Sequence, residues 1–246
     1  MNIINFSSRI NIIKHPIASF KFILGNKKEL HEEIILDSAK YLWPKDFDKE
    51  AWKSYIKEIE INSLIPQNKN KHESIIVGNN LNTTFGKWIY CCIRHLKPEF
   101  IIETGVSHGY SSWIILNALH KNNFGKLFSI DLPNNDTNIN YNFKETVKTG
   151  WLVPDELKYR WDMKLGDAKT ILPQILKEIN YVDIFFHDSD HSYEHMKFEF
   201  DTVQPYFKKG SILLSDDVDK NISFQEHASK FNLKSIQFNK GGTSII

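Results

Sequence analysis

Four aspartates and a histidine lie in two short segments that each follow a strongly apolar stretch of the chain. Residues 187–193 read His-Asp-Ser-Asp-His-Ser-Tyr, and residues 215–218 read Ser-Asp-Asp-Val. When such segments follow neighbouring strands of a parallel sheet, their side chains meet at the same edge of that sheet. We therefore expect Asp188, Asp216 and Asp217 to converge.

Converging carboxylates repel one another, and a hard divalent cation such as Mg²⁺, which takes oxygen ligands, relieves that repulsion. The sequence thus predicts a metal site at Asp188, Asp216 and Asp217. A metal would lower the pKa of a bound hydroxyl, and a neighbouring base would accept its proton. His191 is the candidate base, with Asp188 as its catalytic partner, because the ordinary pKa of histidine, about 6.5, suits proton acceptance near neutral pH.

The alternative for this cluster is structural. Aspartates at strand ends often cap the following helix, and a histidine beside carboxylates is often only a hydrogen-bonded supporting group. Two further histidines are weaker candidates, since His187 is expected on the other side of the sheet and His195 on a helix.

A glycine-containing turn follows an earlier apolar stretch. Residues 103–112 read Glu-Thr-Gly-Val-Ser-His-Gly-Tyr-Ser-Ser, and the two glycines let the backbone turn sharply and let a ligand approach it. Asp131 ends the next apolar stretch, where an acidic side chain can accept the hydroxyls of a ribose. Asp167, in Gly166-Asp167-Ala168, adds a carboxylate at the same edge and is also a good N-cap for the helix that follows.

The order of strands and helices indicates a parallel sheet with helical crossovers. From about residue 84 onward, apolar strand-like stretches alternate with helix-like ones. The expected strands are 100–103, 126–131, 161–165, 182–186, 211–214, 235–238 and 243–246. This pattern predicts an α/β fold that places the glycine turn and the aspartates at one sheet edge.

Residues 1–75 differ from the rest and are expected to form a helical appendage, with residues 76–246 as the catalytic domain. Helical patterns cover residues 29–42 and 52–59, short helices are expected before residue 26, and residues 66–71 read as a surface loop. The appendage is expected to pack against the sheet; the alternatives are a lid, an oligomerisation element or a membrane-surface patch.

Residues 96–218 resemble the class I S-adenosylmethionine-dependent methyltransferases, particularly the bacterial group that includes cephalosporin-biosynthesis and sugar O-methyltransferases. The resemblance rests on the glycine turn, because the family loop Glu-x-Gly-x-Gly-x-Gly corresponds to Glu103, Gly105, Ser107 and Gly109. Serine replaces the middle glycine of that loop. A dehydrogenase would instead show Gly-x-Gly-x-x-Gly in this turn, which makes NAD the weaker cofactor.

The resemblance implies a Rossmann-like, doubly wound, mostly parallel seven-stranded sheet with an antiparallel last strand. It also implies that S-adenosylmethionine binds at the turn, including Ser111, with its ribose at Asp131 and its adenine at Asp167 and Ala168. In metal-dependent members, an Asp on the fourth strand and an acidic pair after the fifth strand hold the metal, which agrees with the cluster above.

Composition excludes some functions. Lys and Arg (31) nearly balance Asp and Glu (30), so the formal charge of +1 gives no reason to expect a nucleic acid partner. No apolar run approaches the length of about 20 residues that a membrane span needs, and the N-terminus lacks the order of a signal peptide.

Cys91 and Cys92 read as buried thiols in a reducing compartment, and the expected location is the cytoplasm.

These observations predict a metal-assisted O-methyltransferase that acts on a hydroxyl of a small molecule, a sugar or a secondary metabolite. The alternatives are a metal-independent N- or C-methyltransferase of the same fold and a non-catalytic cofactor-binding scaffold. A homo-oligomer through the N-terminal helices is a further possibility.

Overall fold

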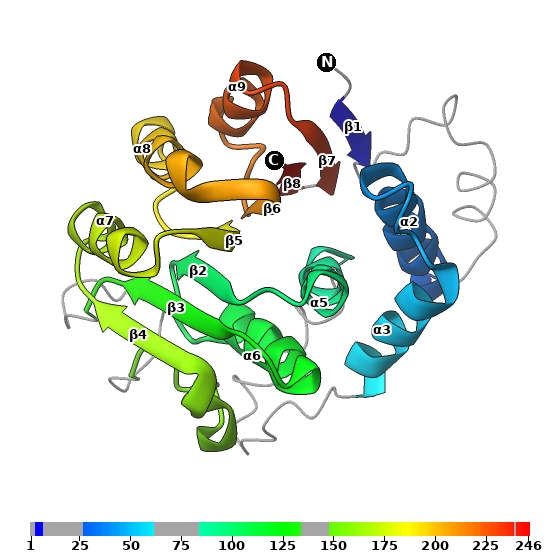
Figure 1. Ribbon diagram of the computed structural model, residues 1–246, viewed down its shortest axis with the longest axis horizontal. Coiled ribbons are helices and arrows are strands. Elements are labelled where there is room, and N and C mark those ends of the chain that lie inside the picture. Colours follow the sequence, from blue (N-terminus) through cyan, green and yellow to red (C-terminus); the bar gives the residue numbers. More distant parts are fainter. Residues whose placement is uncertain (1–2, 7–26, 62–83, 134–147, 239) are drawn as a thin grey trace.

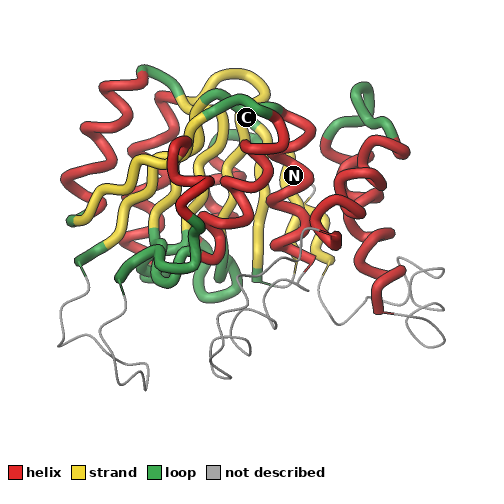
Figure 2. The backbone as a smooth tube through the Cα atoms, turned by 90° about the horizontal axis from the view of Figure 1, so that it is seen from below, coloured by secondary structure: helices red, strands yellow, loops and turns green. Residues whose placement is uncertain are grey.

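In the part of the chain that the structure describes, a single eight-stranded sheet carries helices on both faces (Figures 1 and 2). The computed structural model describes residues 3–6, 27–61, 84–133, 148–238 and 240–246. The strands are β1 (Ile3–Phe6), β2 (Phe100–Thr104), β3 (Lys126–Asp131), β4 (Trp161–Leu165), β5 (Val182–His187), β6 (Phe207–Ser215), β7 (Lys234–Phe238) and β8 (Gly241–Ile245). The α-helices are α2 (Lys27–Leu42), α3 (Lys49–Ile61), α5 (Thr84–Leu96), α6 (Tyr110–Asn122), α7 (Ala168–Ile179), α8 (Tyr193–Val203) and α9 (Ser223–Lys230).

The strand order is β1-β7-β8-β6-β5-β2-β3-β4. All neighbouring pairs are parallel except those of β8, which runs antiparallel to both β6 and β7. The seven expected strands, their mostly parallel order and the antiparallel last strand are confirmed. The structure adds β1 at the edge beside β7, in a part of the chain where only helices were expected. Four residues are too few to show a strand's alternating pattern in the sequence.

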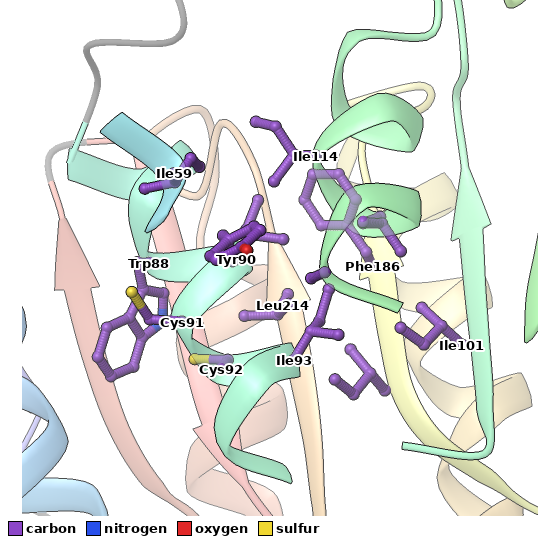
Figure 3. Packing of buried hydrophobic residues seen from close by; sticks show 14 of the residues in the cluster. Ile59, Trp88, Tyr90, Cys91, Cys92, Ile93, Ile101, Ile114, Phe186 and Leu214 are labelled. Carbon is purple, nitrogen blue, oxygen red and sulfur yellow. The ribbon is translucent and has the colours of Figure 1, made fainter. Parts of the chain in front are cut away.

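The two faces of the sheet bury two hydrophobic cores, because successive residues of a strand point to opposite faces. On β2, for example, Ile101 packs with α5 and α6, and Ile102 packs with α7 and α8. Figure 3 shows the first core, where Trp88 and Ile93 of α5 lie near Phe186 and Leu214 of the sheet. Helices on both faces make the sheet doubly wound, as expected.

The two cysteines are free and fully buried in the first core, as the sequence predicted (Figure 3). Burial raises the pKa of both thiols, so they stay protonated and unreactive. They are packing residues of α5.

The N-terminal helices α2 and α3 pack together and against α5, and α2 also contacts strand β7 of the sheet (Figure 1). Trp52 stacks on Trp88 with ring centroids 5.4 Å apart, and the Arg94 Nε of α5 lies 2.8 Å from the Glu58 Oε2 of α3. The helical patterns at 29–42 and 52–59 are therefore confirmed. The short helices expected in residues 7–26 and the loop at 66–71 lie outside the described residues, as does the domain boundary at residue 75, which stays a prediction.

None of the helices in the described ranges is both long enough and apolar enough to cross a membrane.

Candidate active site

Backbone hydrogen bonds join the carboxyl ends of three adjacent strand pairs. Gly105 N, just after β2, donates to Ile130 O of β3 at 2.9 Å. Asp188 N, just after β5, donates to Thr104 O of β2 at 2.8 Å, and Asp216 N, just after β6, donates to the last carbonyl of β5 at 2.9 Å. The glycine turn and the aspartates therefore lie along one edge of the sheet.

Gly105 brings the glycine turn into direct contact with the segment after β5. Its φ angle is +83°, and a Cβ atom at this position would lie 1.9 Å from the carbonyl oxygen of Asp188. Both the backbone conformation and the lack of space require glycine here. A ligand bound on this turn would consequently be a close neighbour of Asp188.

Asp131, at the end of β3, holds the turn in shape. Its Oδ2 accepts hydrogen bonds from Val106 N at 3.1 Å and Ser107 N at 2.6 Å, and its Oδ1 accepts from Leu132 N at 2.8 Å. The residue lies beside the turn as the sequence predicted, but its carboxylate already serves the protein's own amides. Each carboxylate oxygen has two lone pairs, so Oδ1 retains capacity for one more donor.

Glu103 lies beneath the turn rather than facing outward. Its side chain is fully buried, and burial raises its pKa. It accepts hydrogen bonds from the hydroxyls of Ser111 at 2.5 Å, Ser112 at 2.6 Å and Ser129 at 2.7 Å. Glu103 and Ser111 thus support the start of α6 from inside.

The third strand end lies beside Asp131, because Gly166 N donates to Asp131 O at 2.8 Å. Asp167 is exposed and caps α7, its Oδ1 accepting from Lys169 N at 2.8 Å. The capping alternative for Asp167 is therefore confirmed. Ala168 is buried in the second core.

His191 lies between two aspartates from neighbouring strand ends. Its Nε2 is 3.6 Å from Asp188 Oδ1, and its Nδ1 is 3.7 Å from Asp217 Oδ2. Loss of water around Asp188 raises the pKa of its carboxyl to about 7, with a smaller contribution from the charge of Asp216. The neighbouring Asp188 in turn raises the pKa of His191.

Helix capping does not account for Asp188, Asp216 and Asp217. Helix α8 is capped by Ser192, whose hydroxyl accepts from His195 N, and the first amide of α9 is bonded by Asn221. Asp190 is the fourth aspartate of the two segments at 187–193 and 215–218. It accepts a hydrogen bond from Ser192 N at 2.9 Å and stabilises a local turn.

The structure gives no support to the expected three-aspartate metal centre. Asp217 has a left-handed backbone, φ +47°, and its Oδ1 lies 3.1 Å from Lys240 Nζ. Across the described ranges, no group of three or more His, Cys, Asp or Glu side chains is arranged to hold a metal ion. The donor set therefore does not fit the site that was expected at Asp188, Asp216 and Asp217, because a lysine takes the third carboxylate.

A buried carboxylate behind the cluster was missed in the sequence. Glu199 of α8 is fully buried, and His187 Nδ1 lies 2.6 Å from its Oε2. His187 is itself fully buried at the end of β5, and His195 Nε2 lies 2.9 Å from Glu199 Oε1. The i,i+4 spacing of His195 and Glu199 on one helix was the available signal.

A second feature missed in the sequence is the turn at residues 148–153, which packs on the glycine turn. Gly150 N donates to Ser107 O at 2.9 Å, and Leu152 N donates to His108 O at 3.0 Å. The ring of Trp151 meets that of His108 with centroids 6.1 Å apart. Residues 148–153 therefore help to shape the loop, although no local pattern in the sequence links the two segments.

Part of the chain matches a known protein family. Residues 102–218 match the family model described as a methyltransferase domain. The match begins on β2 and ends just after β6, so it contains the glycine turn, Asp131, Asp188 and the acidic pair after β6. This stretch is 117 of the 246 residues, and it is similar to a methyltransferase domain.

Solved methyltransferases share the fold of this domain and of much of the remaining chain. The apo structure of CalS11, described as a TDP-rhamnose 3'-O-methyltransferase of calicheamicin biosynthesis, aligns with a TM-score of 0.51 at 17% identity over 80% of this chain and 93% of that chain. The SAH-bound Podospora anserina methyltransferase PaMTH1 aligns with a TM-score of 0.50 at 12% identity over 87% of this chain and 95% of that chain. Among curated proteins, no sequence gives a significant match to this chain.

Proposed function

We propose that the chain is an O-methyltransferase that moves the methyl group of S-adenosylmethionine to a hydroxyl of a small molecule. The observation that carries the proposal is the contact between the glycine turn and Asp188, since a Cβ atom on Gly105 would lie 1.9 Å from Asp188 O. A donor bound at the turn and a proton acceptor at Asp188 would then be neighbours, which is the arrangement that transfer to a hydroxyl requires.

On the donor side, we assign the cofactor to the turn formed by Gly105, Ser107 and Gly109, with Glu103 and Ser111 supporting it from inside. The free capacity of Asp131 Oδ1 suits a ribose hydroxyl. The family resemblance assigns the adenine to Asp167 and Ala168, and the hydrogen bond from Gly166 N to Asp131 O keeps this strand end beside Asp131. These assignments agree with the S-adenosylhomocysteine named in the PaMTH1 structure.

On the acceptor side, Asp188 and His191 form the proton-accepting pair. Methyl transfer forms a carbon–oxygen bond and breaks the carbon–sulfur bond, whose electron pair stays on sulfur and leaves a neutral thioether. The hydroxyl proton passes to the pair, which releases it to water. A pKa of about 7 at Asp188 suits this role near neutral pH, because catalysis by a base is most efficient when its pKa lies near the working pH.

Metal assistance is a separate hypothesis. Asp188 and Asp216 remain neighbours, and Mg²⁺ in proteins is often held by one or two carboxylates and several waters. The third expected ligand, Asp217, would have to leave Lys240. In the proposed reaction the hydroxyl proton passes to Asp188 and His191. Titration of Mg²⁺ into the protein by calorimetry, with Asp188→Asn and Asp216→Asn as variants, decides whether Asp188 and Asp216 bind it.

A nucleotide sugar is included among the candidate acceptors because the fold relative CalS11 is described as a TDP-rhamnose 3'-O-methyltransferase. The test is a panel of hydroxylated acceptors, including TDP-rhamnose, other sugars and catechols, incubated with S-adenosylmethionine. We expect one class to gain a methyl group on oxygen by mass spectrometry and NMR. Methylation only on nitrogen or carbon, or failure of the protein to bind S-adenosylhomocysteine, would overturn the proposal.

A further inference from the structure

Glu199 lies behind the proposed site and accepts hydrogen bonds from four side chains. Thr104 Oγ1 donates to its Oε2 at 2.7 Å, and Ser189 Oγ donates to its Oε1 at 3.0 Å. The other two donors are the imidazoles of His187 and His195. A carboxylate has about four lone-pair positions, so this side chain is fully satisfied although it is fully buried.

The positions of the donors connect both halves of the site to this carboxylate. Thr104 is the last residue of β2 and immediately precedes Gly105 of the cofactor turn. His187 and Ser189 stand on either side of Asp188. The buried carboxylate of Glu199 therefore joins the end of β2, which leads into the glycine turn, to the segment around Asp188.

The same carboxylate fixes the orientation of His187. An ionised Glu199 can only accept, so His187 Nδ1 must carry the proton that it donates. Its Nε2 is buried and has no hydrogen-bond partner among the described residues. The His187 ring lies edge-on to the ring of His191, with centroids 5.4 Å apart.

Resting on the function proposed above, we propose that Glu199 is a positioning residue for methyl transfer. By holding Thr104, His187 and Ser189 together, it sets the distance between the donor turn and the pair formed by Asp188 and His191. A displacement of about 1 Å between reacting groups costs about a hundredfold in rate, so a side chain that touches neither reactant can control turnover.

The structure supplies a matched control at the opposite end of the same two strands. Asp183, near the start of β5, accepts hydrogen bonds at its Oδ2 from Glu99 N at 2.8 Å and Phe100 N at 2.9 Å. It also joins β5 to β2 through a carboxylate, but at the end of the sheet away from the proposed site. Asp183→Asn therefore tests the structural effect of losing such a link.

The experiment compares Glu199→Gln with Asp183→Asn, using the fastest acceptor of the panel above and S-adenosylhomocysteine as the binding probe. We expect Glu199→Gln to lower kcat about 10- to 100-fold and to leave the Kd for S-adenosylhomocysteine within about threefold. Asp183→Asn should lower the thermal midpoint and leave kcat unchanged. If both variants lose kcat only in proportion to their loss of thermal stability, the positioning role is wrong.

Thr104 provides an independent test if Glu199→Gln does not fold. Thr104→Val keeps the shape of the side chain but removes the hydroxyl that donates a hydrogen bond to Glu199. Thr104→Ser keeps that hydroxyl. We expect kcat to fall in the valine variant and to be retained in the serine variant. Equal losses in both variants would overturn the proposal.

A spectroscopic measurement needs no acceptor. In ¹⁵N-labelled protein, the long-range ¹H–¹⁵N spectrum should show His187 protonated at Nδ1, and Glu199→Gln should change that pattern. A proton on Nε2 alone in the wild-type protein would contradict the inference. Failure of the wild-type protein to bind S-adenosylhomocysteine would instead overturn the proposed function on which the inference rests.

Discussion

Gly105 and Asp188 touch through their backbones: a Cβ atom on the glycine would lie 1.9 Å from the aspartate's carbonyl oxygen. The two residues come from the ends of adjacent parallel strands, β2 and β5. Because the contact involves main-chain atoms, its geometry depends on the sheet and not on a flexible side chain. The donor turn and the acidic segment are therefore built as one unit.

Gly105→Ala should disrupt this unit. A left-handed backbone costs alanine about 1–2 kcal/mol, and the collision with Asp188 adds to that cost. We expect a total loss of more than about 3 kcal/mol in the free energy of unfolding, measured with urea, and at least a tenfold weaker Kd for S-adenosylhomocysteine. Gly210→Ala is the control, since Gly210 has φ +91° but nothing within 4 Å of a Cβ atom. Equal losses of unfolding free energy in Gly105→Ala and Gly210→Ala would show that the contact with Asp188 adds nothing to the cost of the left-handed backbone.

Asp131→Ala should weaken cofactor binding. The change removes the acceptor for the amides of Val106 and Ser107 and the oxygen assigned to the ribose. A hydrogen bond to a charged group contributes about 1.5–3 kcal/mol, so we expect the Kd for S-adenosylhomocysteine to rise at least tenfold by calorimetry. Asp162→Ala on the neighbouring strand β4 removes a carboxylate paired with Lys126 and Lys164, and should leave that Kd unchanged. An unchanged Kd in Asp131→Ala would remove this residue from the cofactor site.

The rate of methyl transfer should depend on pH through the pair of Asp188 and His191. A base works in its unprotonated form, and the pKa of Asp188 is raised to about 7. We therefore expect kcat/KM to rise with pH below about 7 and to reach a plateau above it, with an apparent pKa that belongs to the pair. Asp188→Asn should lower kcat about 10²- to 10⁴-fold while S-adenosylhomocysteine still binds. A flat profile in the wild-type enzyme would argue against a proton-accepting pair at this position.

Glu199 should make the stability of the fold depend on pH in two directions. Burial alone would raise its pKa, but the hydrogen bonds from His187, His195 and Thr104 outweigh burial and lower the pKa from 4.5 to about 2. A lowered folded-state pKa stabilises the protein above about pH 4.5, and this contribution is lost as the pH falls toward 2. The hydrogen bond to Glu199 raises the pKa of His195 above 6.5, and that contribution is lost as the pH rises through the raised value.

The difference in unfolding free energy between the wild type and Glu199→Gln should consequently be largest between about pH 4.5 and 6.5 and smaller on either side. Urea denaturation across this range measures it. If this difference in unfolding free energy did not change with pH, the contact between Glu199 and His195 would not be the cause of either shifted pKa.

The edge of the sheet could be predicted from the sequence because it follows from local patterns. Apolar stretches mark the strands, and the residues directly after a strand must lie at its carboxyl end, so the neighbourhood of Gly105, Asp131, Asp188 and Asp216 follows from topology. The N-terminal strand was missed because four residues carry too little pattern, and β1 is recognised only through its pairing with β7.

The partners of individual side chains could not be predicted in this way. Glu199 accepts a hydrogen bond from Thr104 across 95 positions of the chain, and Asp217, whose backbone is left-handed, pairs with Lys240. Such contacts depend on rotamers and on how α8 and the last strands pack. No spacing rule in the sequence specifies them.

The most direct test of the account is transfer of a ¹³C-labelled methyl group from S-adenosylmethionine to the acceptor panel, followed by NMR of the product. The account predicts a labelled methyl on a hydroxyl oxygen with the wild-type enzyme, and loss of that signal in Asp188→Asn although S-adenosylhomocysteine still binds. A labelled methyl on nitrogen or carbon, or an Asp188→Asn variant as active as the wild type, would contradict it.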